Sequence, residues 1–232
     1  MALPKLTTPT YELDLPSTGE KIKYRPFLVK EQKLLMMAEE SKEEKQISQT
    51  IQQLIGTCTF GKVDAIVSPI FDVEYVFLQL RMRSVGAKIE INITCPDDKK
   101  TQVPVKINLE DVNVLNDEKH TNIVQVTNRI KMVMKYPHLV DMEAMKNTTE
   151  NMFNLLMKCV TEVHDGDTIH NRADINDKEL TEFIDSFNTK QLENLMKFFE
   201  TMPKVRHIVN VTNPKTKVVS EVILEGMDTF LV

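Results

Sequence analysis

The chain has 232 residues, of which 41% are hydrophobic and 27% are charged, and its formal net charge at pH 7 is −5. These values are ordinary for a globular protein with one large domain or two small ones. The negative charge argues against nucleic-acid binding, because neutralising phosphates needs a basic face and no Lys/Arg run is longer than Lys99-Lys100.

The first predicted elements are a ribbon and a helix. Apolar and polar residues alternate on both sides of a turn bracketed by Pro16 and Gly19, which predicts a two-stranded ribbon over residues 10–25. Pro26 ends strand pairing and fixes the direction in which the chain starts the next helix, at about 28–39. These residues carry no chemistry, so the segment is interpreted as a scaffold.

Two further helices are predicted before residue 85. After a break near Ser41, Ser41 and Glu44 have the spacing of a capping box. Apolar residues then recur at helical spacing, at Ile47, Ile51, Leu54, Ile55 and Cys58. In Phe71–Met82 the apolar residues occupy nearly every side, so this helix should be central or covered by another chain.

Strict alternation over 88–95 and 103–109 predicts a hairpin with one wet face. The following segment, Glu110–His120, is polar and acidic with few apolar anchors, and we expect a connector there. We therefore divide the chain into an N-terminal domain of hairpin and helices, 1–110, and a C-terminal helical subdomain closed by a hairpin, 111–232. The predicted fold class is α+β, with β-hairpins combined with amphipathic helices.

The second half begins with an apolar stretch, Ile123–Tyr136, that is consistent with an extended conformation. Three helices follow, and Asn188 and Gln191 have capping-box spacing at the start of the last one. Their apolar residues are Met152, Leu155, Leu156, Cys159 and Val160; Leu180, Phe183, Ile184 and Phe187; and Leu192, Leu195, Met196 and Phe199. A closing hairpin around Asn213 precedes an apolar tail, Met227–Val232.

The residues needed for catalysis or nucleotide binding do not form a motif. No glycine lies within three residues of another, so the G-x-G-x-x-G loop that binds dinucleotides cannot form, and we expect no P-loop either. No serine lies in a Gly-x-Ser-x-Gly sequence. Cys159 has a nearby histidine, His164, but the simpler interpretation is a buried thiol on a helix. We expect no catalytic and no cofactor-binding residues.

Two segments resemble parts of metal sites. Cys95 lies at a hairpin end, where a zinc ribbon carries the first cysteine of a pair, but the second cysteine is missing. The acidic segment from His164 to Glu179 lacks the glycine at position six and the glutamate at position twelve of a calcium-binding loop. We expect no metal ligands, and we interpret the acidic segment as a solvated loop leading into a helix cap.

The location of the protein follows from two features. Cys58, Cys95 and Cys159 are an odd number and lie far apart, which does not indicate a disulfide framework. No window approaches the roughly 20 apolar residues that a membrane span needs. We expect a cytoplasmic protein without a membrane span.

The apolar residues suggest protein partners. The chain has 13 methionines and no tryptophan. Methionine adapts its shape to a partner, so the helix at Phe71–Met82 and the tail at Met227–Val232 could be covered by other proteins. The alternative, weighted equally, is a methionine-rich core without any partner.

Two segments resemble a known family. The run Leu15–Ala38, which contains Arg25-Pro26-Phe27, and the run Phe71–Arg81 with Ser84-Val85-Gly86 resemble the baseplate hub and hub-assembly proteins of T-even-type contractile-tailed bacteriophages. The resemblance covers about the first half of the chain, up to Cys95.

The resemblance implies a non-enzymatic protein that binds other baseplate hub proteins through apolar surfaces, in the host cytoplasm during assembly and in the tail baseplate of the virion. The alternative is a small hydrolase associated with the hub. The implied partner-binding residues are Arg25, Pro26, Phe27 and Leu28 at the corner after the ribbon and Phe71, Tyr75, Leu78 and Arg81 on the central helix.

Overall fold

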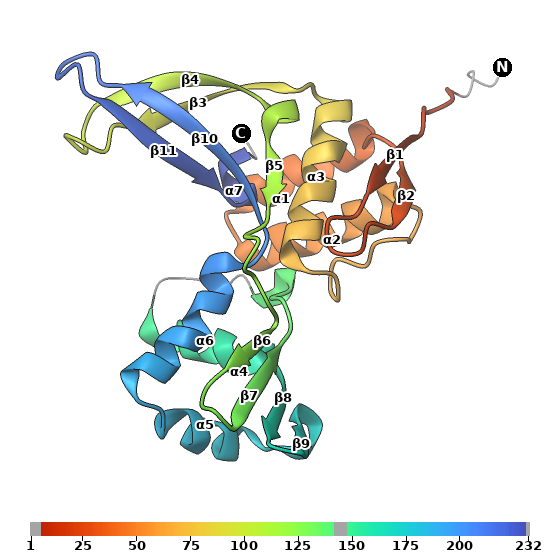
Figure 1. Cartoon of the computed structure of the whole chain (residues 1–232). Coiled ribbons are helices and arrows are strands. Elements are labelled where there is room, and N and C mark those ends of the chain that lie inside the picture. Colours follow the sequence, from red (N-terminus) through yellow and green to blue (C-terminus); the bar gives the residue numbers. More distant parts are fainter. Residues whose placement is uncertain (1–5, 142–147, 231–232) are drawn as a thin grey trace. The chain divides into compact units, whose positions relative to one another are not determined.

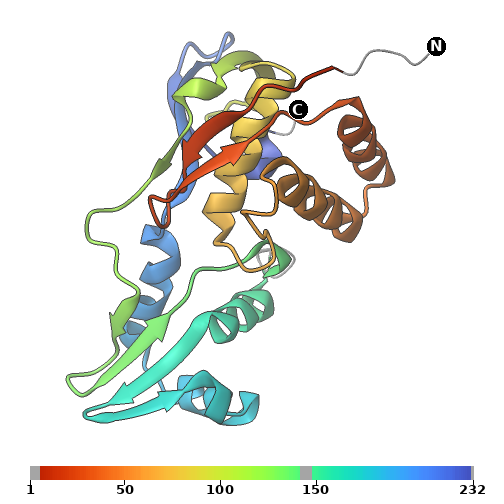
Figure 2. The same cartoon turned by 90° about the vertical axis from the view of Figure 1, so that its right-hand side faces the viewer.

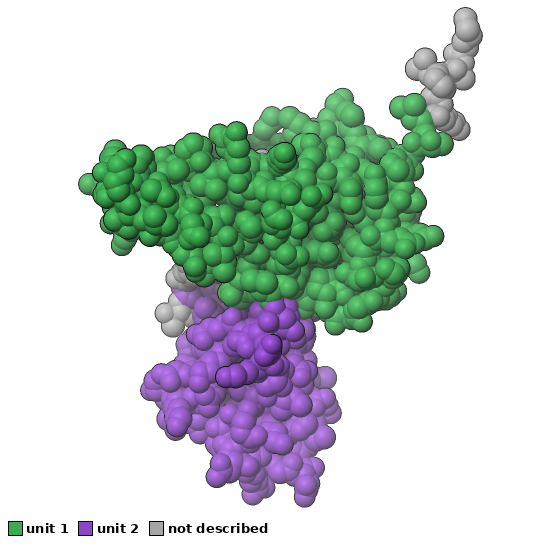
Figure 3. Space-filling view, turned by 45° about the horizontal axis from the view of Figure 1, so that its top comes forward, with its two compact units in different colours: residues 1–115, 204–232 green, residues 116–203 purple. Residues whose placement is uncertain are grey.

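The computed structural model describes residues 6–141 and 148–230, and its fold is α+β, as the sequence predicts. The residues form two compact units, shown in different colours in Figure 3. Unit 1 consists of residues 1–115 and 204–232, and unit 2 consists of residues 116–203. Unit 2 is therefore inserted in sequence between two segments of unit 1.

This division differs from the expected one at residue 110. The closing hairpin belongs to unit 1, because β10 (Lys204–Thr212) pairs with β5 (Asn113–Leu115) as well as with β11 (Val219–Glu225). Glu110–His120 is thus not only a connector, since it contains β5. Leu109 and Val112 are buried and anchor the chain just before this strand.

Unit 1 begins with the predicted ribbon and helices. Strands β1 (Tyr11–Asp14) and β2 (Lys21–Tyr24) are antiparallel, and Leu13 and Ile22 lie opposite each other on the buried face. Helices α1 (Val29–Ser41) and α2 (Glu44–Cys58) follow, and Figure 2 shows them side by side. The ribbon, both helices and the break near Ser41 are confirmed.

The capping box predicted for Ser41 and Glu44 is wrong. The Ser41 hydroxyl donates to the carbonyl of Ala38 (2.7 Å) and accepts from the N–H of Glu43 (3.1 Å), so it closes α1 instead of starting α2. The N-cap residue of α2 is Glu43, and Lys42 adopts a left-handed conformation, with φ 57°. The turn between the helices therefore places the N-cap of α2 at Glu43 and not at Ser41, so Glu44 is not three residues after the N-cap, as a capping box requires.

Helix α3 (Ile70–Ser84) is central in unit 1, where it contacts α2, α7 (Met227–Phe230), β5 and β10 (Figure 1). Its buried residues lie on most of its sides, as the sequence predicts, and include two carboxylates, Asp72 and Glu74. Asp72 accepts hydrogen bonds from the N–H (2.9 Å) and hydroxyl of Ser17 in the β1–β2 turn. Glu74 accepts one from the N–H of Met227 (3.2 Å). Side chains of α3 thus hold both the first hairpin and the last helix.

The rest of unit 1 consists of two antiparallel sheets. The hairpin of β3 (Lys88–Thr94) and β4 (Gln102–Asn108) and the sheet β11-β10-β5 contribute their inward side chains to one core cluster with Leu78 of α3. Both predicted hairpins are confirmed. The cluster includes Ile89, Ile91, Ile93, Cys95, Ile107, Val205, Val211, Leu224 and Phe230. Met227 and Phe230 of the tail are therefore buried, and residues 231–232 lie outside the described range.

Among its described residues, unit 2 has a four-stranded antiparallel sheet and three α-helices. The sheet order is β6 (Ile123–Gln125), β7 (Ile130–Met134), β8 (Val160–Asp165) and β9 (Thr168–Asn171). The helices are α4 (Thr149–Cys159), α5 (Asp177–Asp185) and α6 (Thr189–Thr201). The extended stretch after Ile123 and all three helices are confirmed, whereas β8 and β9 were not predicted.

The capping box at the start of α6 is confirmed. Asn188 Oδ1 accepts from the N–H of Gln191 (3.0 Å), and Gln191 Oε1 accepts from the N–H of Asn188 (2.8 Å).

Buried methionines occur in the core of unit 2, at Met132 and Met134 of β7. Some of the methionine content therefore belongs to the core.

The tips of two hairpins in unit 1 are joined by Asp97. Its carboxylate accepts both hydrogen bonds from Asn213 Nδ2 (3.0 and 3.1 Å) and one from the Thr216 hydroxyl. These donors favour the ionised form and hold the pKa of Asp97 below its ordinary value. Asp97 on the β3–β4 turn thereby holds the turn between β10 and β11.

We expect Asp97→Ala to lower the melting temperature at pH 7, because the hairpin tips lose their shared acceptor. Since the folded pKa is depressed, the carboxylate stabilises the fold at pH values above the ordinary pKa of 3.8, and this contribution is lost as the pH falls through the folded pKa. The difference in melting temperature between wild type and variant should therefore shrink below about pH 4. Glu90→Ala, an exposed carboxylate on β3, is the control. A difference independent of pH would contradict the assignment.

Candidate interaction surfaces

A buried ion pair fixes the corner between β2 and α1. Glu31, in the first turn of α1, has an 8% exposed side chain, and Arg25 has a 13% exposed one. Arg25 Nη2 donates to Glu31 Oε1 (2.9 Å), and the N–H of Leu28 donates to Glu31 Oε2 (2.7 Å). Burial raises the pKa of Glu31, but the hydrogen bonds from Arg25 and Leu28 outweigh it and leave the pKa below its ordinary value. Glu31 is therefore an ionised cap of α1.

Backbone groups tie the same corner to the other two helices. The N–H of Arg25 donates to the carbonyl of Cys58 at the end of α2 (2.9 Å). The N–H of Phe27 donates to the hydroxyl of Ser84 at the end of α3 (2.9 Å), and this hydroxyl donates to Leu80 (2.6 Å). The Arg25-Pro26-Phe27 corner is thus the point at which three helices of unit 1 are joined.

The predicted partner-binding residues mostly lie inside unit 1. Pro26, Phe27, Phe71 and Leu78 are buried, and Arg25 is engaged with Glu31. Tyr75 and Arg81 are half-buried, and Arg81 donates to the carbonyl of Gly86 (3.3 Å). Leu28 is the exposed residue of the set. The structure therefore brings these residues together as a scaffold, and whether any of them contacts a partner stays a prediction.

The solvent-facing side of α1 is unusually apolar. It carries Leu28 (40% exposed), Val29 (66%), Leu34 (46%), Met36 (51%) and Met37 (61%), which we call the α1 face. The buried residues of the helix are Glu31, Leu35 and Ala38. An amphipathic surface helix normally turns its apolar residues toward the core. Sequence reasoning missed this face, although the adjacent pairs Leu34-Leu35 and Met36-Met37 already place apolar residues outside one stripe.

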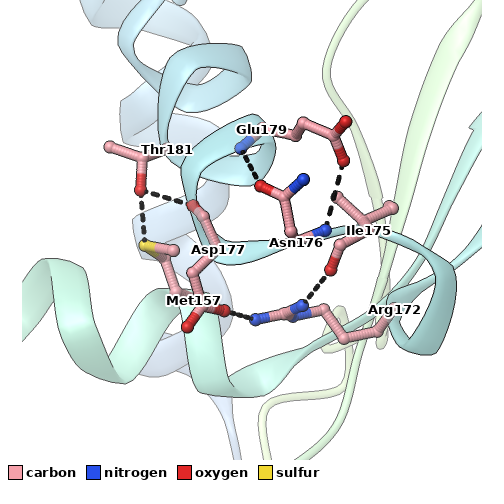
Figure 4. A network of polar contacts seen from close by, with 7 residues as sticks. All are labelled: Met157, Arg172, Ile175, Asn176, Asp177, Glu179 and Thr181. Carbon is pink, nitrogen blue, oxygen red and sulfur yellow. Dashed lines mark hydrogen bonds and ion pairs between the residues drawn. The ribbon is translucent and has the colours of Figure 1, made fainter.

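In unit 2, the start of α5 is organised by a polar network (Figure 4). Asn176 and Glu179 form a capping box, with hydrogen bonds of 2.9 and 3.2 Å. Arg172 donates to the carbonyl of Ile175 (2.6 Å) and to the carboxylate of Asp177. The acidic segment therefore does end in a helix cap, as predicted, but it is not a loop throughout, because it contains the end of β8 and the whole of β9.

Comparison with protein families identifies the chain. The model of the T4 bacteriophage base plate protein family matches residues 8–232. The chain belongs to this family. No curated protein and no solved structure matches it. The family match covers the second half of this base plate protein as well as the first half, in which the resemblance was noted.

The cysteines of this base plate protein are buried and free. Burial raises the pKa of Cys58 to about 11 and that of Cys159 to about 12, so both thiols are protonated at neutral pH. His164 makes a 2.6 Å contact with Glu162. Buried, protonated thiols are poor nucleophiles, which agrees with the interpretation of Cys159 as a small core residue.

A cavity beside the α5 network has a volume of about 460 Å³ and is lined in part by Lys158, Arg172 and Asp177. Its two cations pair with carboxylates, Lys158 with Asp141 (3.1 Å) and Arg172 with Asp177.

Within residues 6–141 and 148–230, no group of three or more His, Cys, Asp or Glu side chains is arranged to hold a metal ion. None of the helices in this described part is long and apolar enough to cross a membrane.

Replacing Glu31 with Ala should destabilise unit 1 by about 2–4 kcal/mol, because Arg25 is left buried without its carboxylate and α1 loses its cap. The free energy of unfolding measured in urea tests this. The matched control is Lys30→Ala: Lys30 lies 3.4 Å from the same carboxylate but its side chain is 72% exposed. Equal losses for the two variants would show that burial of the Arg25–Glu31 pair has no special weight.

Proposed function

We propose that this base plate protein is a non-enzymatic component or assembly factor of the baseplate hub, and that it binds other hub proteins through apolar surfaces. Membership of the T4 base plate family supports a structural role in the phage baseplate. The resemblance of Leu15–Ala38 and Phe71–Arg81 to hub and hub-assembly proteins supports the hub in particular. Such a protein works in the host cytoplasm during assembly and then in the tail.

The observation that carries the proposal is the α1 face. Its five apolar side chains are 40–66% exposed on one short helix and the residue before it. Burying such a side chain from full exposure contributes about 1.5–3 kcal/mol, and these side chains are about half exposed, so completing the burial of each contributes roughly half of that. Interface cores are enriched in methionine, whose flexible side chain fills gaps left by a partner. Lys33 and Glu40 are exposed on the same helix and, at helical spacing, lie between Val29, Met36 and Met37, so the face carries one charge of each sign among its apolar side chains.

The predicted contact residues take two roles in this proposal. Leu28 belongs to the contact surface itself. The remaining seven act as its support: Arg25, Pro26 and Phe27 fix the start of α1, while Phe71, Tyr75, Leu78 and Arg81 lie on α3, to which the corner is hydrogen-bonded through Phe27 and Ser84. Rigid support lowers the entropy cost of binding, because the helix does not need to be ordered by its partner.

The hydrolase alternative has no specific observation in its favour. Hydrolysis of a glycosidic bond needs two carboxyl groups facing each other across a cleft. In the 460 Å³ cavity, the carboxylate of Asp177 accepts a hydrogen bond from Arg172, and the carbonyl of Asp177 accepts one from the hydroxyl of Thr181. These hydrogen bonds belong to the first turn of α5. We therefore propose partner proteins, and neither a substrate nor nucleic acid, as the ligands of this chain.

Met36→Gln combined with Met37→Gln should abolish copurification of the tagged chain with baseplate proteins from infected cells. The melting temperature should change little, because these side chains are exposed. Copurified proteins are identified by mass spectrometry in assembly intermediates and in mature particles. The matched control, Lys45→Ala with Gln49→Ala, changes exposed polar residues of the neighbouring helix α2, outside the α1 face.

Undiminished copurification of the methionine variant would refute the α1 face as the contact surface. Phe27→Ala separates core from surface: it should destabilise the protein by about 3–5 kcal/mol, because Phe27 is buried. A stable Phe27→Ala protein that loses its partners would instead place the contact at the corner. Recovery of the chain in intermediates alone would identify it as an assembly factor.

A further inference from the structure

Unit 2 contains a small pocket between one face of its sheet and helix α5. The strand register places Ile130 opposite Asp165, and Val163 opposite His170, so these four side chains share one face of the sheet. Helix α5 supplies the other wall. The pocket has a volume of about 230 Å³ and is lined by Ile130, Val163, Asp165, His170, Ile175, Glu179, Leu180 and Phe183.

The size and lining of the pocket fit a single apolar side chain. Pockets for drug-sized ligands and cofactors measure about 300–1,000 Å³, which is larger than this one. Five of the lining residues are aliphatic or aromatic. Leu180 and Val163 are buried, and the Phe183 ring packs edge-on against Phe187 with a centroid distance of 4.9 Å. The walls are therefore packed in place and do not need a ligand to form.

The surroundings of the pocket are strongly acidic. Residues 160–187 contain eight Asp and Glu but two Lys and Arg, a formal net charge of −6, whereas the whole chain has −5. Arg129, from the β6–β7 turn, adds one positive charge by pairing with Asp165 (2.5 Å). Glu179 at the pocket keeps its carboxylate on the cap of α5. A ligand that reaches this pocket thus meets a negative potential, which favours a cation.

Strand β9 offers backbone groups next to the pocket. It is one of the two edge strands of the four-stranded sheet, and its residues Thr168–Asn171 are all exposed. His170 of this strand lines the pocket, while Ile169 points to the opposite face. An exposed edge can pair with an added strand, whose alternate side chains then enter pockets on one face of the sheet.

We propose that this pocket anchors one apolar side chain of an extended, Lys/Arg-rich segment of a partner protein, which pairs with the edge of β9. The apolar walls bind the side chain, and the acidic surroundings select its basic neighbours and reject acidic segments. This site lies in unit 2 and is independent of the α1 face in unit 1.

The test uses the full chain and fluorescein-labelled synthetic peptides. The probe is a peptide of six lysines with one central leucine, and its binding is measured by fluorescence anisotropy. Alanine in place of the leucine should weaken binding about tenfold, because the anchor is lost. A peptide with glutamates in place of the lysines should not bind.

Variants of the chain locate the site. His170→Trp fills the pocket and should weaken binding of the leucine peptide about tenfold, whereas Ile169→Trp, one residue away on the opposite face, should leave it unchanged. Glu179→Gln keeps the capping hydrogen bonds but removes a charge at the pocket, and should weaken binding about threefold. Glu182→Gln, outside the lining, is its control. Circular dichroism checks that each variant is folded.

Equal binding of the leucine and alanine peptides would overturn the proposal, since charge alone would then explain the affinity. Binding of the glutamate peptide, or full binding by His170→Trp, would do the same. If His170→Trp does not fold, the ratio of leucine to alanine peptide affinities on the wild-type chain decides. Sedimentation covers one more outcome: a dimer that His170→Trp dissociates would assign the pocket to a second copy of the chain.

Discussion

The buried pair of Arg25 and Glu31 determines where α1 begins, and the surface of unit 1 depends on that position. Successive residues of an α-helix are rotated by about 100°, so a start displaced by one residue would turn Leu35 and Ala38 out of the core. The pair need not add much to stability, because removing two charges from water is costly. Its effect is to specify one register for the helix, and hence one set of exposed side chains.

A second constraint is that α3 must satisfy two buried carboxylates. Burial raises the pKa of Asp72, and the N–H and hydroxyl of Ser17 offset part of this cost. Glu74 uses the N–H of Met227. Both partners are distant in sequence, so the first hairpin and the last helix fold onto the same helix. The inserted unit 2 therefore interrupts the sequence of unit 1 without interrupting its core.

The sequence predicted elements whose pattern is local and strong. Ile89, Ile91 and Ile93 alternate without exception, and β3 has them all buried on one face. In β8, by contrast, Val163 lies between Glu162 and His164, and the alternation of apolar and polar residues is short. The sequence pattern therefore does not predict this strand. Its pairing with β7 stabilises it instead. The pairing of β5 with β10 could not be predicted, because it joins residues about ninety positions apart. Capping-box spacing is a correct predictor at Asn188 but a wrong one at Ser41. There, Lys42 adopts a left-handed conformation, so the chain turns before α2 begins.

The predicted partner-binding residues show why a sequence resemblance identifies the family of a protein more readily than its binding surface. Phe71 and Leu78 belong to an all-round apolar helix, and such a helix is equally consistent with a core and with a covered interface. The structure assigns both residues to the core. The α1 face and the pocket of unit 2 differ in chemistry, one being rich in methionine and the other surrounded by carboxylates. Apolar contact favours slow dissociation, whereas charge favours fast and selective association. If the chain binds partners at both of the proposed surfaces, each surface accepts a partner of different chemistry.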